Sequence, residues 1–249
     1  MLPAVMVEPT GMPTLEVRGL HKRFGRLEVL RAMDLAFAPG RVTAVVGPNA
    51  AGKSTLLKCA LGLVRPDRGE VLFEGVPVTG QHDYRRAIGF MPQRAAFPEN
   101  LTGREVLGLV RGLHPDADEQ DEDLLHRFGL ESQLDKPVRT LSGGTRQKLN
   151  AVVAFLFRPR LIILDEPTAG LDPLASSILK EKLAELVDRG VTVVLTSHVM
   201  SEIEELAETV VFMVDGQAHF NGSMESLRRL TGEQRLERAV ARLTRARVA

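Results

Sequence analysis

The chain has little cysteine, no excess of charge of either sign and no long hydrophobic run, and each shortage excludes something. The single cysteine, Cys59, excludes a disulfide within the chain and fits a reducing compartment. Lysine plus arginine equals aspartate plus glutamate at 32 residues each, so the net charge does not indicate nucleic-acid binding. No apolar run approaches the roughly 18 to 20 residues of a membrane-spanning helix. We therefore expect a soluble, cytoplasmic protein, and any channel that it serves belongs to another chain.

The first 13 residues differ in composition from the rest of the chain. They contain no basic residue, which argues against a secretory signal peptide, and their proline and glycine content after Glu8 favours a flexible extension. The remaining residues are numerous enough to bury a large core, as one domain or as a domain with a subdomain.

The most informative feature is a glycine-containing loop between an apolar run, Val42–Val46, and a helical pattern. That order of strand, glycine loop and helix is the context of a phosphate-binding P-loop, although a Gly-rich turn between a strand and a helix would look similar. Backbone N–H groups and the positive helix N-terminus cradle phosphates, Lys53 reaches the outer ones and Ser54 places a hydroxyl on Mg²⁺. The predicted nucleotide-binding residues are Gly47, Pro48, Asn49, Ala50, Ala51, Gly52, Lys53, Ser54 and Thr55.

Two carboxylates follow a second apolar run, Leu161–Leu164. Such a run is typical of a buried parallel strand, and the C-terminal ends of parallel strands open on ligand sites. Asp165 fits a magnesium-binding role and Glu166 fits the group that polarises the attacking water. An ordinary strand end is the alternative, and the P-loop favours the catalytic interpretation.

A second glycine pair lies between these motifs. Ser142 is a good N-cap, and Gly143 and Gly144 allow a ligand to approach the backbone before a helical pattern begins. This stretch is interpreted as a second helix N-terminus that receives an anion, with an ordinary helix-capping linker as the alternative.

Together, these residues resemble the nucleotide-binding subunit of ATP-binding-cassette (ABC) transporters. Leu141-Ser142-Gly143-Gly144 is similar to the family's signature loop, and Ala169-Gly170-Leu171-Asp172 is similar to its D-loop. By the same resemblance Phe24 corresponds to the aromatic residue that stacks on adenine, Gln93 to the Q-loop glutamine and His198 to the switch histidine. The resemblance covers residues 15 to 225 and implies binding of ATP and Mg²⁺. It implies catalysis by Glu166, His198 and Gln93, and magnesium ligation by Ser54, Gln93 and Asp165.

The sequence departs from the family pattern at two positions. Ala50 stands where the family usually has glycine, and Thr145 stands where glutamine usually ends the signature loop. We expect activity with altered kinetics, since neither change removes a group that contacts phosphate by itself. Among the site residues, Phe24 could instead belong to the core. His198 could be a structural histidine, and Asp172 fits both a helix N-cap and the D-loop.

The expected architecture is α/β: a P-loop NTPase core with a mixed, mainly parallel sheet, a small antiparallel β subdomain and an inserted α-helical subdomain. The expected segments are an extension over residues 1–13, an ATPase domain over 14–225 with a helical subdomain at about 94–150, and a basic tail over 226–249. The acidic run from Asp116 to Asp123 is expected to be a solvated surface. The tail has the pattern of a basic amphipathic helix, which either packs on its own domain or meets anionic lipid or a partner.

The resemblance implies an ATPase subunit that powers a separately encoded membrane permease and lies on the inner face of the membrane. Since the family holds ATP between the P-loop of one subunit and the signature loop of another, a homodimer is expected. The segment Arg94–Leu101 lies where the family receives the permease, and Phe97 is the expected anchor.

Two other functions fit the P-loop less well. A soluble, non-transport ABC ATPase acting on ribosomes or DNA usually has two cassettes or a long coiled-coil insertion, and the sequence has neither. A kinase or GTPase would leave the signature loop unexplained.

A finer resemblance concerns the cargo. Leu141 to Asn150, together with Phe97-Pro98-Glu99-Asn100-Leu101-Thr102, is similar to ATPases that serve copper-site maturation of nitrous oxide reductase. The six histidines and eight methionines are scattered without metal-ligand spacing, so no copper site is expected in this chain.

Overall fold

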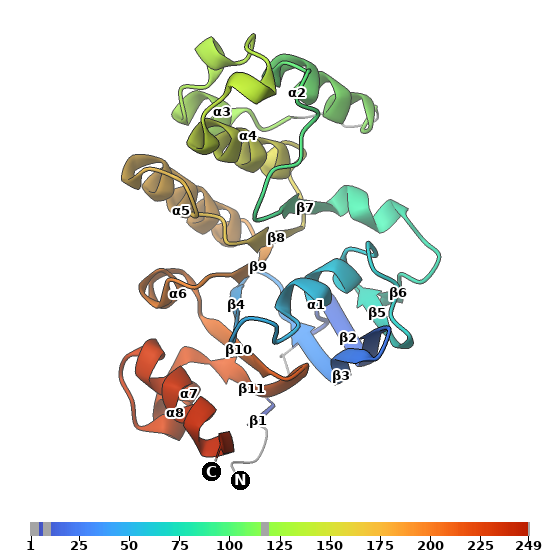
Figure 1. Ribbon diagram of the computed structural model, residues 1–249, viewed down its shortest axis with the longest axis vertical. Coiled ribbons are helices and arrows are strands. Elements are labelled where there is room, and N and C mark those ends of the chain that lie inside the picture. The colour runs from blue at the N-terminus through green and yellow to red at the C-terminus, as the bar shows by residue number, and fades with distance from the viewer. Residues whose placement is uncertain (1–4, 7–10, 116–119, 249) are drawn as a thin grey trace. The chain divides into compact units, whose positions relative to one another are not determined.

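The computed structural model describes residues 5–6, 11–115 and 120–248. The chain forms two compact units (Figure 1). The P-loop unit comprises Met1–Tyr84 and Thr192–Ala249, and the helical unit comprises Arg85–Val191.

The core of the P-loop unit is a mixed sheet built on valine-rich strands. Every residue of β4 (Val42–Val46) and β9 (Thr192–Thr196) is buried, as expected for parallel strands covered on both faces. β4 pairs in parallel with β9 and with β10 (Thr209–Val214), and β10 pairs antiparallel with β11 (Gln217–Ser223). Within the predicted N-terminal extension, β1 (Val5–Met6) pairs in parallel with β11. Residues 1–4 and 7–10 lie outside the described part, so flexibility there stays a prediction.

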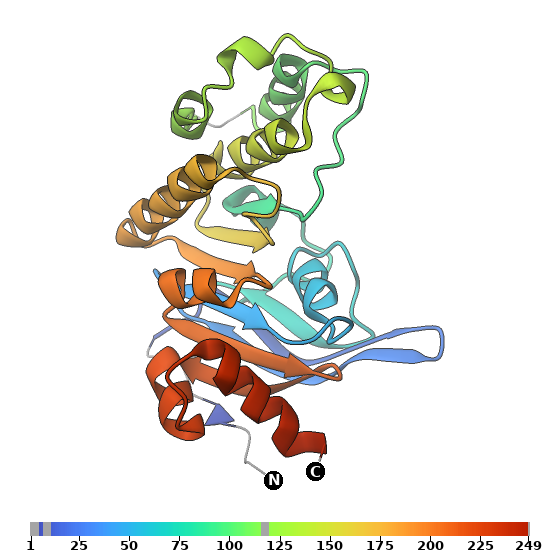
Figure 2. The same ribbon diagram turned by 60° about the vertical axis from the view of Figure 1, so that its left-hand side comes forward.

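A separate antiparallel sheet completes the strands of this unit. It consists of β2 (Leu15–Phe24), β3 (Leu27–Phe37), β5 (Arg68–Phe73) and β6 (Val76–Pro77), in the order β3-β2-β5-β6. β2 and β3 form a long hairpin, drawn in blue in Figure 2. This is the predicted antiparallel subdomain.

The described residues of the P-loop unit form four α-helices: α1 (Lys53–Ala60), α6 (Met200–Leu206), α7 (Met224–Thr231) and α8 (Leu236–Val248). The apolar residues Leu236, Ala239 and Leu243 of α8 are buried, and α8 packs on α7 and α6. The basic tail therefore packs on its own unit, and it begins with α7 two residues before the predicted boundary.

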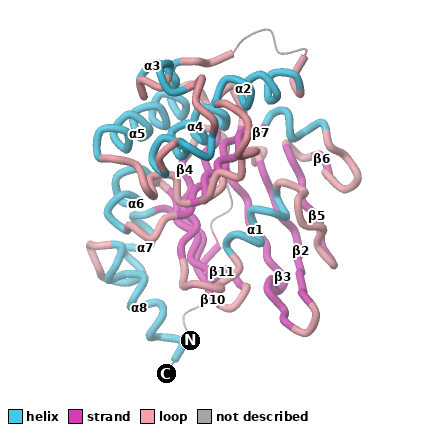
Figure 3. The backbone as a smooth tube through the Cα atoms, turned by 45° about the horizontal axis from the view of Figure 1, so that its top comes forward, coloured by secondary structure: helices cyan, strands magenta, loops and turns pink. Residues whose placement is uncertain are grey.

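Among its described residues, the helical unit contains one parallel strand pair and four α-helices, and the helices are labelled in Figure 3. The strands are β7 (Ile88–Met91) and β8 (Leu161–Asp165), and the helices are α2 (Gly103–Gly112), α3 (Asp123–Arg127), α4 (Gly143–Phe155) and α5 (Pro173–Asp188). Short 3₁₀ turns lie at Asp83–Ala87, Glu131–Gln133 and Val138–Thr140. The first of them begins two residues before the helical unit. Helix ends follow the local sequence: Thr102 and Glu105 form a capping box, and Gly190, at φ +85°, follows the end of α5.

The acidic run is not simply a solvated surface, so that expectation was wrong where the structure describes it. The Lys182 side chain on α5 is 3% exposed, and its ammonium contacts the carboxylates of Asp121 at 2.8 Å and Asp123 at 3.1 Å. Burial acts to raise the pKa of Asp123, but its hydrogen bond with Lys182 holds that pKa below the ordinary value. Because a buried ammonium needs compensating charge, these aspartates form a long-range ion-pair cluster. Residues 116–119 lie outside the described part.

Candidate nucleotide-binding and catalytic site

The P-loop connects β4 to α1 through positions where only glycine fits. A Cβ on Gly47 would lie 2.0 Å from the carbonyl oxygen of Met213, and a Cβ on Gly52 would lie 2.7 Å from that of Val29. Both glycines also have positive φ, at +153° and +98°. The predicted loop is therefore built into the sheet by close backbone contacts.

Lys53 lies against the loop, as a phosphate-binding lysine would. Its ammonium donates to the carbonyl oxygens of Gly47, at 2.6 Å, and Pro48, at 3.0 Å. The residue before α1 is Gly52, which has no side chain to cap the helix. The positive end of the α1 helix dipole faces the loop that precedes it, an arrangement suited to an anion.

Ala50 has φ +63°, in the left-handed region that glycine adopts without cost. For a residue with a Cβ, this conformation is less favourable than the right-handed one by about 1 kcal/mol. Ala50 therefore has a strained backbone at the position where the family usually has glycine.

Cys59 faces the core from α1. Burial raises the pKa of its thiol to about 11, so Cys59 acts as a small apolar residue, as expected.

Phe24 is 51% exposed at the end of β2, so the alternative that it belongs to the core is wrong. The Lys22 ammonium lies 5.3 Å from the centre of its ring. An exposed ring on a hairpin end suits stacking on a flat ligand.

His198 lies at the same sheet edge as the P-loop. In the parallel pairing of β4 with β9, Val45 is opposite Thr196. Gly47 and His198 each follow two residues later along their strands, and His198 is exposed. The strand register therefore places the start of the P-loop and His198 at the same end of neighbouring strands.

Gln93 and Glu166 meet in the helical unit. β7 and β8 are paired in parallel with Met91 opposite Leu164, so Gln93 and Glu166 occupy matching positions two residues further on. The side-chain amide of Gln93 donates through Nε2 to Oε2 of Glu166 at 2.8 Å. The strand register thus sets a polar amide against the expected catalytic carboxylate.

Glu166 has φ +52°, a conformation that few non-glycine residues adopt. Strained backbone of this kind gathers at functional sites, where the surrounding structure holds it in place. Asp165 closes β8 directly before it.

The signature loop caps α4. Ser142 accepts a hydrogen bond from the N–H of Thr145 at 3.1 Å, and the two hydroxyls lie 2.8 Å apart. Thr145, the departure from the family pattern, is therefore part of the cap. Nothing described lies within 4 Å of a Cβ built on Gly143, which leaves this N-terminus open for a ligand.

The signature loop and the D-loop lie together. A Cβ on Gly144 would approach the carbonyl oxygen of Gly170 to 3.1 Å, and Lys148 pairs with Asp172 at 2.8 Å. Asp172 also caps α5 by accepting from the N–H of Ala175, so both expected roles of Asp172 are compatible. The Lys148 hydrogen bond holds the pKa of Asp172 below its ordinary value.

The residues expected to hold Mg²⁺ offer suitable chemistry. Ser54, Gln93 and Asp165 supply hydroxyl, amide and carboxylate oxygens, the hard donors that this ion prefers. The amide oxygen of Gln93 is not engaged by the bond to Glu166, which uses the nitrogen. The described residues contain no cluster of three His, Cys, Asp or Glu side chains with metal-binding geometry.

The site residues divide between the two units. Phe24, the P-loop and His198 belong to the P-loop unit, whereas Gln93, the signature loop, Asp165 and Glu166 belong to the helical unit. In α4, sequence reasoning overlooked Lys148, which pairs with Asp172, and Asn150, which donates to the Pro92 carbonyl oxygen. The available signal was two polar residues three apart, Gln147 and Asn150, within the otherwise apolar face of that helix.

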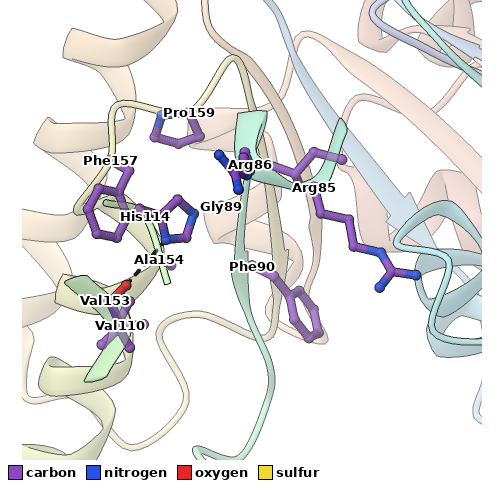
Figure 4. Close-up of a pocket in the computed structure, with 11 residues that line it drawn as sticks. Arg85, Arg86, Gly89, Phe90, Val110, His114, Val153, Ala154, Phe157 and Pro159 are labelled. Carbon is purple, nitrogen blue, oxygen red and sulfur yellow. Dashed lines mark hydrogen bonds between the residues drawn. The ribbon is translucent and has the colours of Figure 1, made fainter. Parts of the chain in front are cut away.

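A cavity of about 160 Å³ lies beside β7 (Figure 4). Phe90 lines it, and the rings of His114 and Phe157 stack there with centres 4.1 Å apart. The His114 ring is fixed by a 3.2 Å hydrogen-bond contact between Nδ1 and the Val110 carbonyl oxygen.

Comparison with known proteins agrees with this geometry. Residues 30–169 match the family model described as ABC transporter. The chain is 36% identical to the daunorubicin resistance ATP-binding protein DrrA3 of Streptomyces coeruleorubidus, over 90% of this chain and 72% of that protein. It is 32% identical to the lantibiotic transport ATP-binding protein SrtF of Streptococcus pyogenes, over 88% of this chain and 96% of that protein.

Solved structures give the same answer. An ATP-binding subunit of an ABC transporter superposes with a TM-score of 0.85 at 30% identity, over 93% of this chain and 99% of that one. A dimeric ATP-binding cassette bound to ADP and Pi, at 24% identity, shares the fold with a TM-score of 0.76, over 84% and 98%. With the P-loop, the signature loop and the Gln93–Glu166 pair in place, the chain belongs to the ABC transporter family and is one of its ATP-binding, ATP-hydrolysing subunits.

Proposed function

We propose that this ATPase powers a separately encoded membrane permease, with Glu166 as the group that orients and deprotonates the attacking water. The observation that carries the assignment is the 2.8 Å hydrogen bond from Gln93 to Glu166, made at the ends of two paired strands. A carboxylate so held has a defined direction in which to accept a proton.

The remaining site residues take complementary roles. Phe24 stacks on the adenine, and Gly47 to Thr55 hold the phosphates. Ser54, Gln93 and Asp165 ligate Mg²⁺, which neutralises phosphate charge when bound. His198, which follows β9 at the P-loop edge of its sheet, contacts the outer phosphate.

The working ATPase is a homodimer. One chain has one P-loop and one open signature helix N-terminus, so two copies joined by a two-fold axis give two equal sites in which both motifs face one triphosphate. ATP favours the closed dimer by its higher affinity for that state, and hydrolysis reverses the preference.

The permease places the ATPase on the inner face of the cell membrane. No helix of the described residues is long and apolar enough to span a bilayer. The segment after Gln93, with the half-buried Phe97, directly follows β7, whose Phe90 lines the aromatic cavity. A hydrophobic permease element that contacts this segment would meet the apolar ring of Phe97.

The names of the relatives favour an export transporter, since they describe daunorubicin resistance, lantibiotic transport and Nod factor export. A role in copper-site maturation of nitrous oxide reductase stays a prediction from the signature region. The identity of the neighbouring permease decides between these cargoes.

Glu166→Gln tests the assignment. The amide keeps size but is not a base, so ATP binding should persist while turnover falls by about 100-fold or more. The trapped ATP should hold two chains together as a dimer in light scattering. Glu237→Gln, the same change at an exposed position of α8, is the matched control and should behave as wild type. Hydrolysis by Glu166→Gln at the control's rate would remove Glu166 from this role.

Membrane fractionation and nucleotide competition test the rest of the proposal. A permease-coupled ATPase should sediment with membranes only when its permease is present and should prefer ATP over GTP. Recovery with ribosomes or DNA instead would favour the non-transport alternative.

A further inference from the structure

Helix α4 is fixed to β7 at two points one helical turn apart. At the first, a Cβ on Gly89 would lie 2.1 Å from the carbonyl oxygen of Ala154, so the two backbones touch. At the second, the side-chain amide of Asn150 donates through Nδ2 to the carbonyl oxygen of Pro92 at 2.8 Å. The strand end and the helix therefore keep one relative position.

The second contact is placed where it governs Gln93. Met91 is the last residue of the β7–β8 ladder, and Pro92 follows with no N–H to continue it. The Pro92 carbonyl is held by Asn150, which is 3% exposed. Gln93 is the next residue. The hydrogen bond at Pro92 therefore fixes the backbone directly before the residue whose side chain contacts Glu166.

The other end of α4 is the signature loop. Ser142 caps the helix, and Lys148 ties its second turn to Asp172 of the D-loop. Asn150 is two residues beyond Lys148, near the middle of this helix of 13 residues. α4 therefore contacts the D-loop near the signature loop and, through Pro92, the segment that carries Gln93.

We propose that Asn150 is a positioning residue for ATP hydrolysis. Its amide holds the Pro92 carbonyl oxygen and so fixes the backbone from which the Gln93 side chain reaches Glu166. Because Asn150 lies on α4, the position of this helix also determines the position of Gln93. The inference rests on the proposed roles of Gln93 and Glu166 and adds the residue that ties them to α4.

The neighbouring Gln147 supplies a matched comparison. It lies one turn before Asn150 and is 6% exposed, but its Nε2 has no hydrogen-bond partner among the described residues. Its oxygen is 3.4 Å from Asn150 Nδ2, a long contact beside the 2.8 Å bond to Pro92. Gln147 and Asn150 thus place two buried amides on one face of α4, and of these two, Asn150 binds the end of β7 at Pro92.

The test compares Asn150→Ala and Asn150→Asp with Gln147→Met in the full chain, assayed with ATP and Mg²⁺. Asn150→Asp keeps the size but removes both N–H donors. Both Asn150 variants should lower kcat by about 10- to 100-fold, because a misplaced reacting group loses rate steeply. KM for ATP should stay within about threefold, since phosphate binding is untouched. Gln147→Met should keep kcat within about twofold.

A double-mutant cycle separates positioning from general stability. If Asn150 acts through Gln93, then adding Asn150→Ala to Gln93→Ala should cause little further loss of kcat. If the double variant instead loses kcat by the product of the two single losses, the proposal is overturned. Unchanged turnover in an Asn150 variant would also overturn it. Loss of ATP binding together with a lowered melting temperature in both Asn150 variants would also overturn it, because Asn150 would then be structural.

Glu166→Gln in the same assay keeps the two failures distinct. If Glu166→Gln is inactive while the Asn150 variants turn over normally, only the positioning inference fails. If Glu166→Gln also hydrolyses ATP normally, the catalytic assignment on which the inference rests has failed.

Discussion

At the scale of single residues, two non-glycine positions of the candidate site have left-handed backbone, Ala50 at φ +63° and Glu166 at φ +52°. Ala50 lies between Gly47 and Gly52, which are held by close backbone contacts, and Glu166 directly follows the end of β8. The strain is therefore held by neighbours that cannot relax without disturbing the sheet. We interpret both as part of the geometry that presents backbone and carboxylate to the ligand.

Phe24 gives a prediction at this scale. Because its ring is exposed, Phe24→Ala should weaken ATP binding by about tenfold or more, the equivalent of roughly 1 to 3 kcal/mol for base–aromatic stacking. The melting temperature of the nucleotide-free protein should stay nearly unchanged, and titration with a fluorescent ATP analogue gives the affinity.

Leu27 is the matched control for Phe24. It is 67% exposed and lies directly opposite Phe24 in the β2–β3 hairpin. Leu27→Ala removes a comparable apolar side chain from the same place and should leave ATP affinity alone. Equal losses from both variants would assign the effect to the hairpin instead of to adenine stacking.

At the scale of elements, local sequence was sufficient wherever a signal and its structural consequence lie close together. The P-loop, the N-caps at Ser142 and Asp172 and the end of α5 shortly before Gly190 follow from neighbouring residues. Contacts over long sequence separations did not follow in this way. Asn150 with Pro92 and Lys182 with Asp121 join residues 58 and 61 positions apart, and hydrophobic periodicity carries no information about such polar pairs.

The ion pairs between α5 and the chain around α3 give a prediction at this scale. Lys182→Met leaves the buried carboxylate of Asp121, whose side chain is 10% exposed, without its partner. Breaking such a pair from one side should lower the free energy of unfolding by about 3 to 5 kcal/mol, measured by urea denaturation.

The double variant Lys182→Met with Asp121→Asn should recover part of this loss, since no uncompensated charge then remains. Lys136→Met, at an exposed lysine of the same unit, should change stability little. A loss as large from Lys136→Met would mean that lysine removal in general, and not the buried pair, lowers the stability.

At the scale of the whole molecule, the permease contact gives the remaining prediction. Phe97→Asp places a charge in the segment that we propose to meet the permease, so co-purification with the permease should be abolished. ATP binding by the isolated subunit should remain intact, because Phe97 lies in none of the nucleotide-binding motifs. Pull-down from membranes that contain both proteins measures the first, and a nucleotide titration measures the second.

Recovery of the wild-type amount of complex from Phe97→Asp would place the interface elsewhere. The next candidate would then be the basic tail at α8, where the arginines at positions 235, 238, 242 and 245 are exposed. Reversal of those charges would be the corresponding experiment.

The parallel register of β7 with β8 also limits how this family member can change in length. Gln93 faces Glu166 because both residues lie two places beyond a matched pair, so one inserted or deleted residue between Ile88 and Gln93 would move the glutamine out of reach. Between α2 and α3, the described residues 113–115 and 120–122 lie in no strand and have no such register to keep. Over evolutionary time, gains and losses of residues should therefore gather between α2 and α3, and the spacing from β7 to the glutamine should stay constant among relatives that still hydrolyse ATP.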